Sequence, residues 1–348
     1  MNETPAEEDV RRELERGAAP APGVPAVPSR RAYVFVMRNA LVFGFVGLTV
    51  LFVALGAPNF LTLGNFSNIV RLSAPIMMVS IPMAFLLIMG YVDLSVGSQL
   101  ALSAVVTGLL ITNLGVPPLI AIACAVVVTA GVGFINGTLT TRLGLSPIIV
   151  TLGMLTAVRG VALLAAPNSI YAFFPIDFAA VSYTGVLGIP YYGIAEAVVV
   201  VAGAFVLAWS PVGRHALAIG VNEEAAFLSG INSRRTIQAA FVVTGALAGV
   251  AGVMYALLLN SAPSGQLGVG FELDVLTAVL LGGVAFNGGR GTIRGVVLGV
   301  LFLAVLQNGL ILLNVPTSFG LVIKGAALVF AALLDQATVR ALFVSKGR

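Results

Sequence analysis

The sequence predicts an all-α fold, a polytopic transmembrane helix bundle of about ten spans with both termini in the cytoplasm. Of the 348 residues, 59% are hydrophobic and only 9% are charged, whereas an ordinary soluble domain carries about 25% charged residues. The mean hydropathy is +1.05, and the basic residues gather between long apolar runs. A water-soluble fold is excluded, because it would need far more charge to cover its surface.

The chain divides into a polar N-terminal tail, a membrane domain and a short C-terminal tail. The first 31 residues combine charged residues with a Pro/Ala stretch and almost no large apolar side chains. Such a composition cannot bury a core, so residues 1–38 are expected to form a disordered cytoplasmic tail. The membrane domain is expected over 39–340, and a cytoplasmic tail over 341–348.

Apolar runs that approach membrane-crossing length follow one another from residue 40 onward, since a crossing helix needs about 20 apolar residues. Pro75 and Pro82 lie inside the second run and predict a kinked or broken helix there. The eighth run is shorter than the others. The predicted spans are 40–57, 72–91, 95–114, 117–138, 147–166, 189–209, 236–259, 272–286, 294–313 and 317–335.

The distribution of lysine and arginine sets the orientation. If the N-terminal tail is cytoplasmic and the spans alternate, all but three of the 18 basic residues fall in cytoplasmic segments. The segments 167–188 and 260–271 contain no lysine or arginine and are assigned to the outside. We therefore expect a multi-pass protein of the bacterial inner membrane, surrounded by lipid. The basic loops account for the pI near 9.5 without a nucleic-acid partner.

Few residues offer metal or nucleotide chemistry. The single cysteine, Cys124, and the single histidine, His215, leave no His/Cys metal cluster. The glycine pairs at 282–283 and 288–289 are not followed by a lysine at P-loop spacing and are better suited to tight turns. We expect no cofactor, and the energy for any transport must come from a partner or an ion gradient.

The cytoplasmic loop 210–235 contains a short, well-capped helix. Asn222 is a good N-cap, Glu223 and Glu224 place negative charge on the first turn, and Gly230 suits a left-handed C-terminal end. The residues Ala225, Leu228 and Ile231 form a small apolar face. Because a helix this short is unstable alone in water, it must pack on its own bundle or on a partner.

Four stretches resemble signatures of the ribose/xylose/arabinose-type ABC transporter permease family, and they follow in family order from about residue 60 to 335. Gly220-Val-Asn222-Glu-Glu-Ala225-Ala226-Phe-Leu-Ser229-Gly230-Ile231-Asn232 resembles the coupling-helix signature G-x-N-x-x-A-A-x-x-S-G-I. Gly90-Tyr-Val-Asp93-Leu94-Ser95-Val96-Gly97-Ser98 resembles G-x-I-D-L-S-V-G-S. Asn136-Gly137 with Ser146-Pro147-Ile-Ile-Val-Thr151-Leu152-Gly153 resembles N-G…P-x-I-V-T-L-G. Gly270-Phe-Glu272-Leu273-Asp274, with the two glycine pairs, resembles G-x-E-L-D…L-G-G…G-G-x-G.

The resemblance implies a permease subunit of an ABC importer for a sugar or sugar-like solute. It implies that helix 222–231 docks on a cytoplasmic ABC ATPase, that a second permease subunit, expected to be a homodimer partner, completes the path, and that a periplasmic or lipid-anchored solute-binding protein delivers the solute. The ATPase-coupling residues are then Gly220, Asn222, Glu223, Glu224, Ala225, Ala226, Leu228, Gly230 and Ile231. The stretch 284–287 departs from the small, Ser/Thr-bearing family pattern and leaves the solute in doubt.

Polar residues at membrane depth are candidates for the translocation path, because such groups are costly unless they line water or find partners. Asp93 and Ser95 lie between two spans too close for a solvated loop, which predicts a re-entrant break that faces solute or a simple buried helix cap. For Asn136, Thr151 and Asn308, contact with solute and hydrogen bonding between helices both remain open.

Two other classes compete with the importer. An ion-coupled secondary transporter would use Asp93, Glu196, Glu272 or Asp274 as its coupling carboxylate, but it leaves the capped cytoplasmic helix without a role. An intramembrane enzyme would pair a serine or carboxylate with a histidine, and His215 lies in a cytoplasmic loop. The chain is therefore not expected to be an enzyme.

Overall fold

The computed structural model describes residues 40–57, 59–171, 174–186, 188–316 and 318–329. The predicted tails 1–38 and 341–348 lie outside the described residues. Within the described residues the all-α class is confirmed, since helices dominate and the four strands have two residues each. A helix overlaps each of the ten predicted spans, and seven of these helices are long and apolar enough to cross a membrane.

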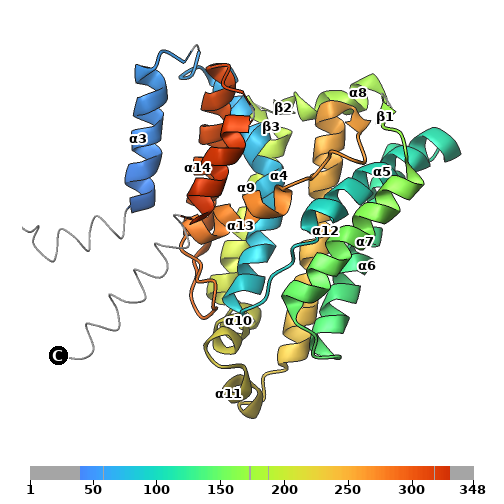
Figure 1. Cartoon of the computed structure of the whole chain (residues 1–348), viewed down its shortest axis with the longest axis vertical. Helices are drawn as coiled ribbons and strands as arrows, with labels where there is room; N and C mark the ends of the chain where they lie inside the picture. The colour runs from blue at the N-terminus through green and yellow to red at the C-terminus, as the bar shows by residue number, and fades with distance from the viewer. Residues whose placement is uncertain (1–39, 58, 172–173, 187, 317, 330–348) are drawn as a thin grey trace, which may run out of the picture. The chain divides into compact units, whose positions relative to one another are not determined.

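The seven long helices form the body of the bundle (Figure 1). They are α4 (Leu63–Ile88), α5 (Val96–Leu114), α6 (Pro118–Thr141), α7 (Pro147–Ala165), α9 (Tyr191–Trp209), α12 (Ser233–Leu259) and α14 (Ile293–Leu312). Proline occupies the first turn of α6 and α7, where its missing N–H is not needed. The sequence therefore marks these two starts closely.

Shorter elements complete the chain. The helices are α3 (Ala40–Ala54), α8 (Ile176–Ala179), the 3-10 turn η1 (Ala180–Ser182), α10 (Pro211–Val221), α11 (Glu223–Leu228), α13 (Phe271–Leu281) and an apolar helix at Ser318–Val329. The strands are β1 (Ile170–Tyr171), β2 (Gly185–Val186), β3 (Ile189–Pro190) and β4 (Ser261–Ala262). β1 pairs antiparallel with β4, and β2 with β3, so they tie loops at one end of the bundle.

Two predicted spans differ from the structure. The second was predicted to be kinked or broken at its prolines; α4 is not broken there but continues through Pro75 and Pro82, and the chain breaks at 89–95. The eighth was expected over 272–286, but α13 ends at Leu281. Its 11 residues extend about 16 Å, roughly half of the hydrocarbon thickness, so α13 is a half-helix.

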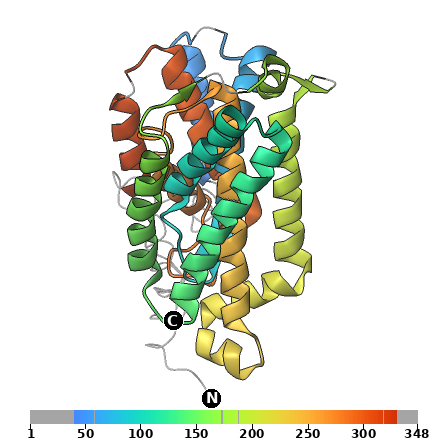
Figure 2. The same cartoon turned by 90° about the vertical axis from the view of Figure 1, so that its right-hand side faces the viewer.

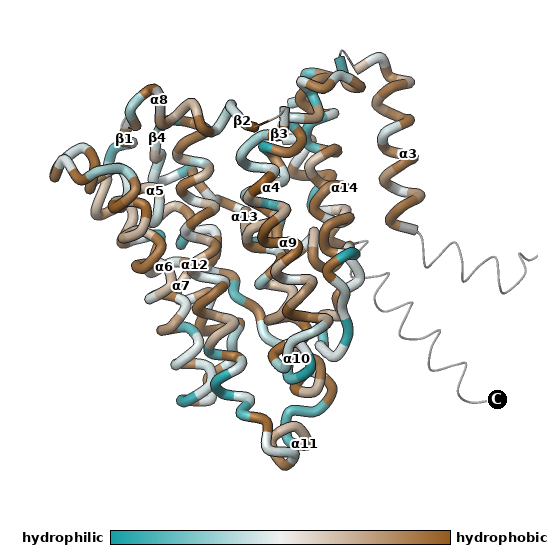
Figure 3. Tube along the Cα trace, turned by 180° about the vertical axis from the view of Figure 1, so that it is seen from behind, coloured by the Kyte–Doolittle hydropathy of each residue, from teal (hydrophilic) through white to brown (hydrophobic). Residues whose placement is uncertain are grey.

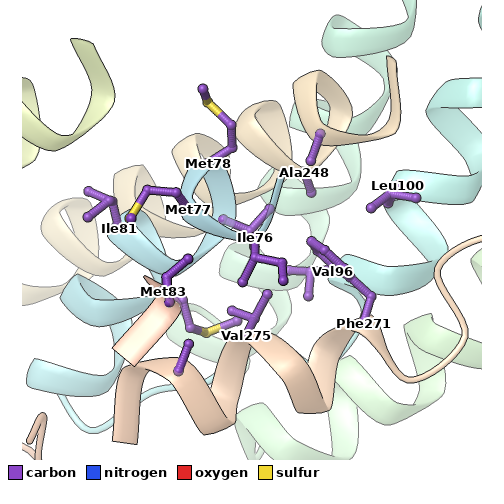
Figure 4. Close-up of a cluster of buried hydrophobic side chains, with 14 of the residues drawn as sticks. Ile76, Met77, Met78, Ile81, Met83, Val96, Leu100, Ala248, Phe271 and Val275 are labelled. Atoms are coloured by element: carbon purple, nitrogen blue, oxygen red, sulfur yellow. The ribbon is translucent and has the colours of Figure 1, made fainter. Parts of the chain in front are cut away.

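α4 forms the centre of the core. Its side chains from Ser73 to Ile88 are all buried, and Figure 4 shows Ile76, Met77 and Met83 among side chains from α5, α12 and α13. By contrast, α6, α7 and α9 turn most of their side chains outward. This division suits a bundle whose outer helices contact lipid.

α6 and α12 pack at backbone distance and run side by side (Figure 2). A Cβ atom at Gly133 of α6 would overlap the carbonyl oxygen of Phe241 in α12. A Cβ at Gly252 of α12 would likewise overlap the carbonyl oxygen of Leu100 in α5. These glycines permit the close approach that holds helices together where no hydrophobic effect drives them.

Candidate functional site

α11 is a two-turn helix with both ends capped as the sequence predicts. The Asn222 side chain accepts a hydrogen bond from the backbone N–H of Ala225 at 2.9 Å. At the other end Gly230 has φ 83°, and the N–H of Ile231 donates to the carbonyl of Ala226 at 3.0 Å. These local bonds stabilise a helix that is otherwise too short to persist.

The apolar residues of α11 point in two directions. Ala226 is the side chain that packs on the protein, with 4% exposed, and Ile231 is half-buried. Phe227 and Leu228 are 69% and 79% exposed. The predicted face of Ala225, Leu228 and Ile231 therefore does not cover the bundle, because Ala225 and Leu228 face away from it. α11 offers an apolar surface that the described chain leaves uncovered.

α10 precedes α11 and was not anticipated, although Ser210 before Pro211 is a typical helix start. The Ser210 hydroxyl accepts a hydrogen bond from the N–H of Gly213 at 3.3 Å. α10 and α11 lie at the lower end of the bundle in Figure 3, where teal stretches mark their hydrophilic residues. The loop 210–235, predicted to be cytoplasmic, therefore contains a helical pair, α10 and α11, rather than one helix in a flexible connector.

Gly220, near the end of α10, lies directly against the end of α4. A Cβ at Gly220 would overlap the carbonyl oxygen of Ile88 and come within 2.5 Å of the backbone nitrogen of Gly289. The N–H of Gly289 donates to that same Ile88 carbonyl at 2.8 Å. Gly288 and Gly289 have φ values of 84° and 77°, so this glycine pair forms a tight turn, as expected.

A side-chain hydrogen bond links α11 to the break after α4. The hydroxyl of Tyr91 donates to Oε2 of Glu223 at 2.9 Å. The Tyr91 ring meets Phe241 of α12 edge-on, with ring centroids 6.5 Å apart. Burial, followed by the hydrogen bond and charge of Glu223, raises the pKa of Tyr91 above its ordinary value, so the hydroxyl remains a donor. Sequence reasoning missed Tyr91.

The break itself is held by a buried polar cluster. Oδ1 of Asp93 accepts from the backbone N–H of Ser95 at 2.9 Å and from its hydroxyl at 2.6 Å. Oδ2 of Asp93 accepts from the amides of Gln99 at 3.1 Å and Asn136 at 3.2 Å. All four residues have no exposed surface. Asp93 therefore fixes the turn before α5, and Ser95, at the N-cap position, donates its hydroxyl to Asp93 and makes no side-chain capping bond.

The structure brings Asp93, Ser95 and Asn136 together but assigns other partners to the remaining path candidates. Thr151 donates to the carbonyl of Pro147 in its own helix at 2.8 Å. Asn308 of α14 exchanges two hydrogen bonds with Asn65 of α4, at 2.9 and 2.8 Å. Sequence reasoning missed Gln99 and Asn65, because a lone amide in an apolar run gives no sign of its partner.

Most carboxylates at membrane depth form an ion pair or accept hydrogen bonds within the protein. Asp274 in α13 forms an ion pair with Lys324 at 2.7 Å, which supplies the partner that Lys324 requires. Oε2 of Glu196 accepts from the hydroxyl of Ser73 at 2.9 Å. Among the described residues, no three His, Cys, Asp or Glu side chains lie close enough together to hold a metal ion.

Arg159 of α7 also finds its partners within the protein. Its guanidinium donates to the carbonyls of Ser264 at 3.1 Å and Leu267 at 2.6 Å, in the segment before α13. The single histidine, His215, lies on α10 of the helical pair.

Comparisons with known proteins agree with this architecture. Residues 65–332 match the family described as "Branched-chain amino acid transport system / permease component". The L-arabinose ABC transporter permease protein AraH of Azospirillum brasilense is 36% identical over 91% of this chain and 94% of its own length. The chain belongs to the ABC transporter permease family. It is a multi-pass inner-membrane transport subunit and not an enzyme.

Other relatives extend the permease family match. The ribose import permease protein RbsC of Bacillus subtilis is 37% identical over 84% of this chain and 91% of its own length. The D-allose transport system permease protein AlsC of Escherichia coli is 35% identical over 83% of this chain and 88% of its own length. No solved structure matches.

Proposed function

We propose that this permease forms the translocation path of an ABC importer for a sugar or sugar-like solute. The observation that carries the proposal is α11, a doubly capped helix whose Phe227 and Leu228 are 69% and 79% exposed. A cytoplasmic ABC ATPase covers this surface and transmits its closure to the bundle. The ATPase-coupling residues are those predicted from the sequence: Gly220 and Ala226, which pack on the bundle, with Asn222, Glu223, Glu224, Ala225, Leu228, Gly230 and Ile231.

The proposed orientation follows from the basic residues. Three exposed arginines flank α11 in the sequence. Arg214 lies on α10, and Arg234 and Arg235 lie in the first turn of α12. The positive-inside rule assigns this end to the cytoplasm. This proposal includes the ten predicted crossings and the two cytoplasmic termini. The helix of the eighth crossing, α13, covers only part of the membrane thickness.

The proposed solute path passes the break between α4 and α5. Broken helices in transporters often face solute, because they free backbone groups for hydrogen bonding. Asp93, Ser95 and Asn136 shape the break, and Thr151 and Asn308 are the further candidates. In the described arrangement these side chains bond to the protein, so solute contact requires a second arrangement in which the break opens.

The remaining partners follow the relatives. Their names specify L-arabinose, ribose and D-allose, so we propose a pentose, a hexose or a similar polyhydroxylated solute. A second copy of the chain completes the path, and a periplasmic or lipid-anchored protein delivers the solute. An ion-coupled mechanism is the competing function, but the bonds of Asp93, Asp274 and Glu196 leave it fewer free carboxylates.

The test is co-purification followed by transport. The tagged chain is extracted in mild detergent, and the ATPase that accompanies it is identified by its P-loop. The complex is reconstituted with the binding protein from the same operon, and uptake of arabinose, ribose and allose is measured with ATP and with a proton gradient alone. ATP-dependent uptake supports the proposal, whereas uptake driven by the gradient without an ATPase contradicts it.

A further inference from the structure

The segment 88–95 touches the cytoplasmic helical pair and the buried polar cluster at once. At its start, the carbonyl of Ile88 accepts the N–H of Gly289 at 2.8 Å and lies against Gly220 of α10. Near its end, Asp93 accepts hydrogen bonds from three residues of α5, α6 and the α5 N-cap. One short stretch of chain therefore spans the distance between α10 and the helices α5 and α6.

Tyr91 lies in the middle of this segment and is its link to α11. Its ring is held against Phe241 of α12, and its hydroxyl donates to Glu223 at 2.9 Å. Within the described residues, the other side-chain hydrogen bonds of α11 stay inside its own loop, and the bond from Tyr91 is the one that joins α11 to another part of the chain. Glu224, the next residue of α11, is exposed and makes no such bond within the same residues.

We propose that Tyr91 is a positioning residue that couples displacement of α11 to the break at Asp93, through its hydrogen bond to Glu223. The inference rests on the proposed function, in which an ATPase moves α11. It adds a specific connection, because nothing in the capped helix itself reaches the buried cluster.

Tyr91 and Asp93 are joined by a very short stretch of chain. Only Val92 separates Tyr91 from Asp93, so the two α-carbons lie at most about 7 Å apart along the chain. Residues 91–93 have no regular secondary structure that would absorb a displacement. Val92 is itself buried, so the segment is packed and not free to slide. A shift of Glu223 that carries the Tyr91 hydroxyl therefore pulls on the residue whose carboxylate holds Ser95, Gln99 and Asn136.

The experiment measures solute transported per ATP hydrolysed by the reconstituted complex. Tyr91→Phe removes the hydroxyl and keeps the ring against Phe241. We expect this ratio to fall about three- to tenfold, the loss given by one hydrogen bond of ordinary strength, while ATP hydrolysis and ATPase binding persist. Glu223→Ala should give the same loss, and the double variant should be no worse than either single one. Glu223→Gln keeps an acceptor oxygen and should stay near wild type.

Tyr183→Phe is the matched control, because it also removes a tyrosine hydroxyl, one that donates to the carbonyl of Leu258 at 2.9 Å, and it should leave the ratio unchanged. A wild-type ratio for Tyr91→Phe, or losses that add in the double variant, would overturn the inference. An equal loss in Tyr183→Phe would overturn it too. Failure of the wild-type chain to bind any ATPase would instead refute the proposed function, so the two failures are distinguishable. Melting of each variant in detergent verifies that the bundle is intact.

Discussion

Gly230 closes the C-terminal end of α11 with φ 83°, a conformation that L side chains rarely adopt. A Cβ atom built there meets no heavy atom within 4 Å. Any effect of substitution therefore comes from the backbone and not from a clash. Gly230→Val is the strongest such perturbation, because β-branched residues are the least tolerant of positive φ.

The magnitude follows from the cost of that conformation. A left-handed conformation costs a non-glycine residue about 1–2 kcal/mol, and strained backbone positions reach about 3 kcal/mol. At about 2 kcal/mol, the ratio of capped to uncapped helix falls roughly 30-fold. Gly230→Asn should cost much less, because asparagine tolerates this region. The chain itself places Asn59, Asn260 and Asn314 at positive φ.

The assay combines hydrogen exchange with binding. We expect Gly230→Val to lose amide protection over 223–231 and to weaken binding of the co-purifying ATPase by about 10- to 30-fold. Transport should be lost, while membrane insertion and melting of the bundle stay unchanged, because a Cβ at Gly230 touches nothing in it. Gly230→Asn should stay within about threefold of wild type. Unchanged ATPase affinity in Gly230→Val would refute the reasoning.

Three further substitutions test the membrane part by melting in detergent. The carboxylate of Asp93 accepts four hydrogen bonds. Asp93→Asn replaces one of its oxygens with an NH2 donor that faces other donors, and we expect the free energy of unfolding to fall by about 3 kcal/mol. An unchanged melting temperature would argue against a structural cluster. Gly133→Leu should unfold the bundle, since even a Cβ there overlaps α12, whereas Gly131→Leu on the same helix meets nothing within 4 Å and should be neutral; equal effects would contradict the packing. Lys324→Met leaves Asp274 unpaired at membrane depth and should destabilise by about 3 kcal/mol; adding Asp274→Leu should restore much of the loss.

The sequence predicted each helix over its continuous apolar run, and it missed the helical turns that contain polar residues at the end of such a run. α4 begins at Leu63, nine residues before the predicted start, since 72 − 63 = 9. Its first turns contain Asn65 and Arg71, which lower the hydropathy of the run. Thr62 caps this end by accepting from the N–H of Asn65 at 3.2 Å. A hydropathy window cannot detect a polar first turn that hydrogen bonds hold in the helix.

Site features that depend on neighbouring residues in the sequence were predicted, and features that depend on contacts between distant parts of the chain were missed. Asn222 and Gly230 were recognised because capping depends only on neighbouring backbone groups. The partner of Lys324 was not, because Asp274 lies fifty residues away in sequence. Likewise, the spacing of Ala225 and Leu228 suggested a packing face, but the orientation of α11 on the bundle buries Ala226. Local rules cannot supply that orientation.

The central claim is that an ATPase covers the exposed surface of α11, and site-specific cross-linking tests it most directly. Cys124 is exposed, so it is first replaced by serine. Leu228→Cys, at a position 79% exposed on α11, then receives a benzophenone maleimide, and Val269→Cys, 69% exposed before α13, serves as the control. We predict a light-dependent adduct of the chain with the ATPase from position 228 and none from position 269. No adduct at 228 in a complex that still contains the ATPase, or an adduct only at 269, would contradict the account.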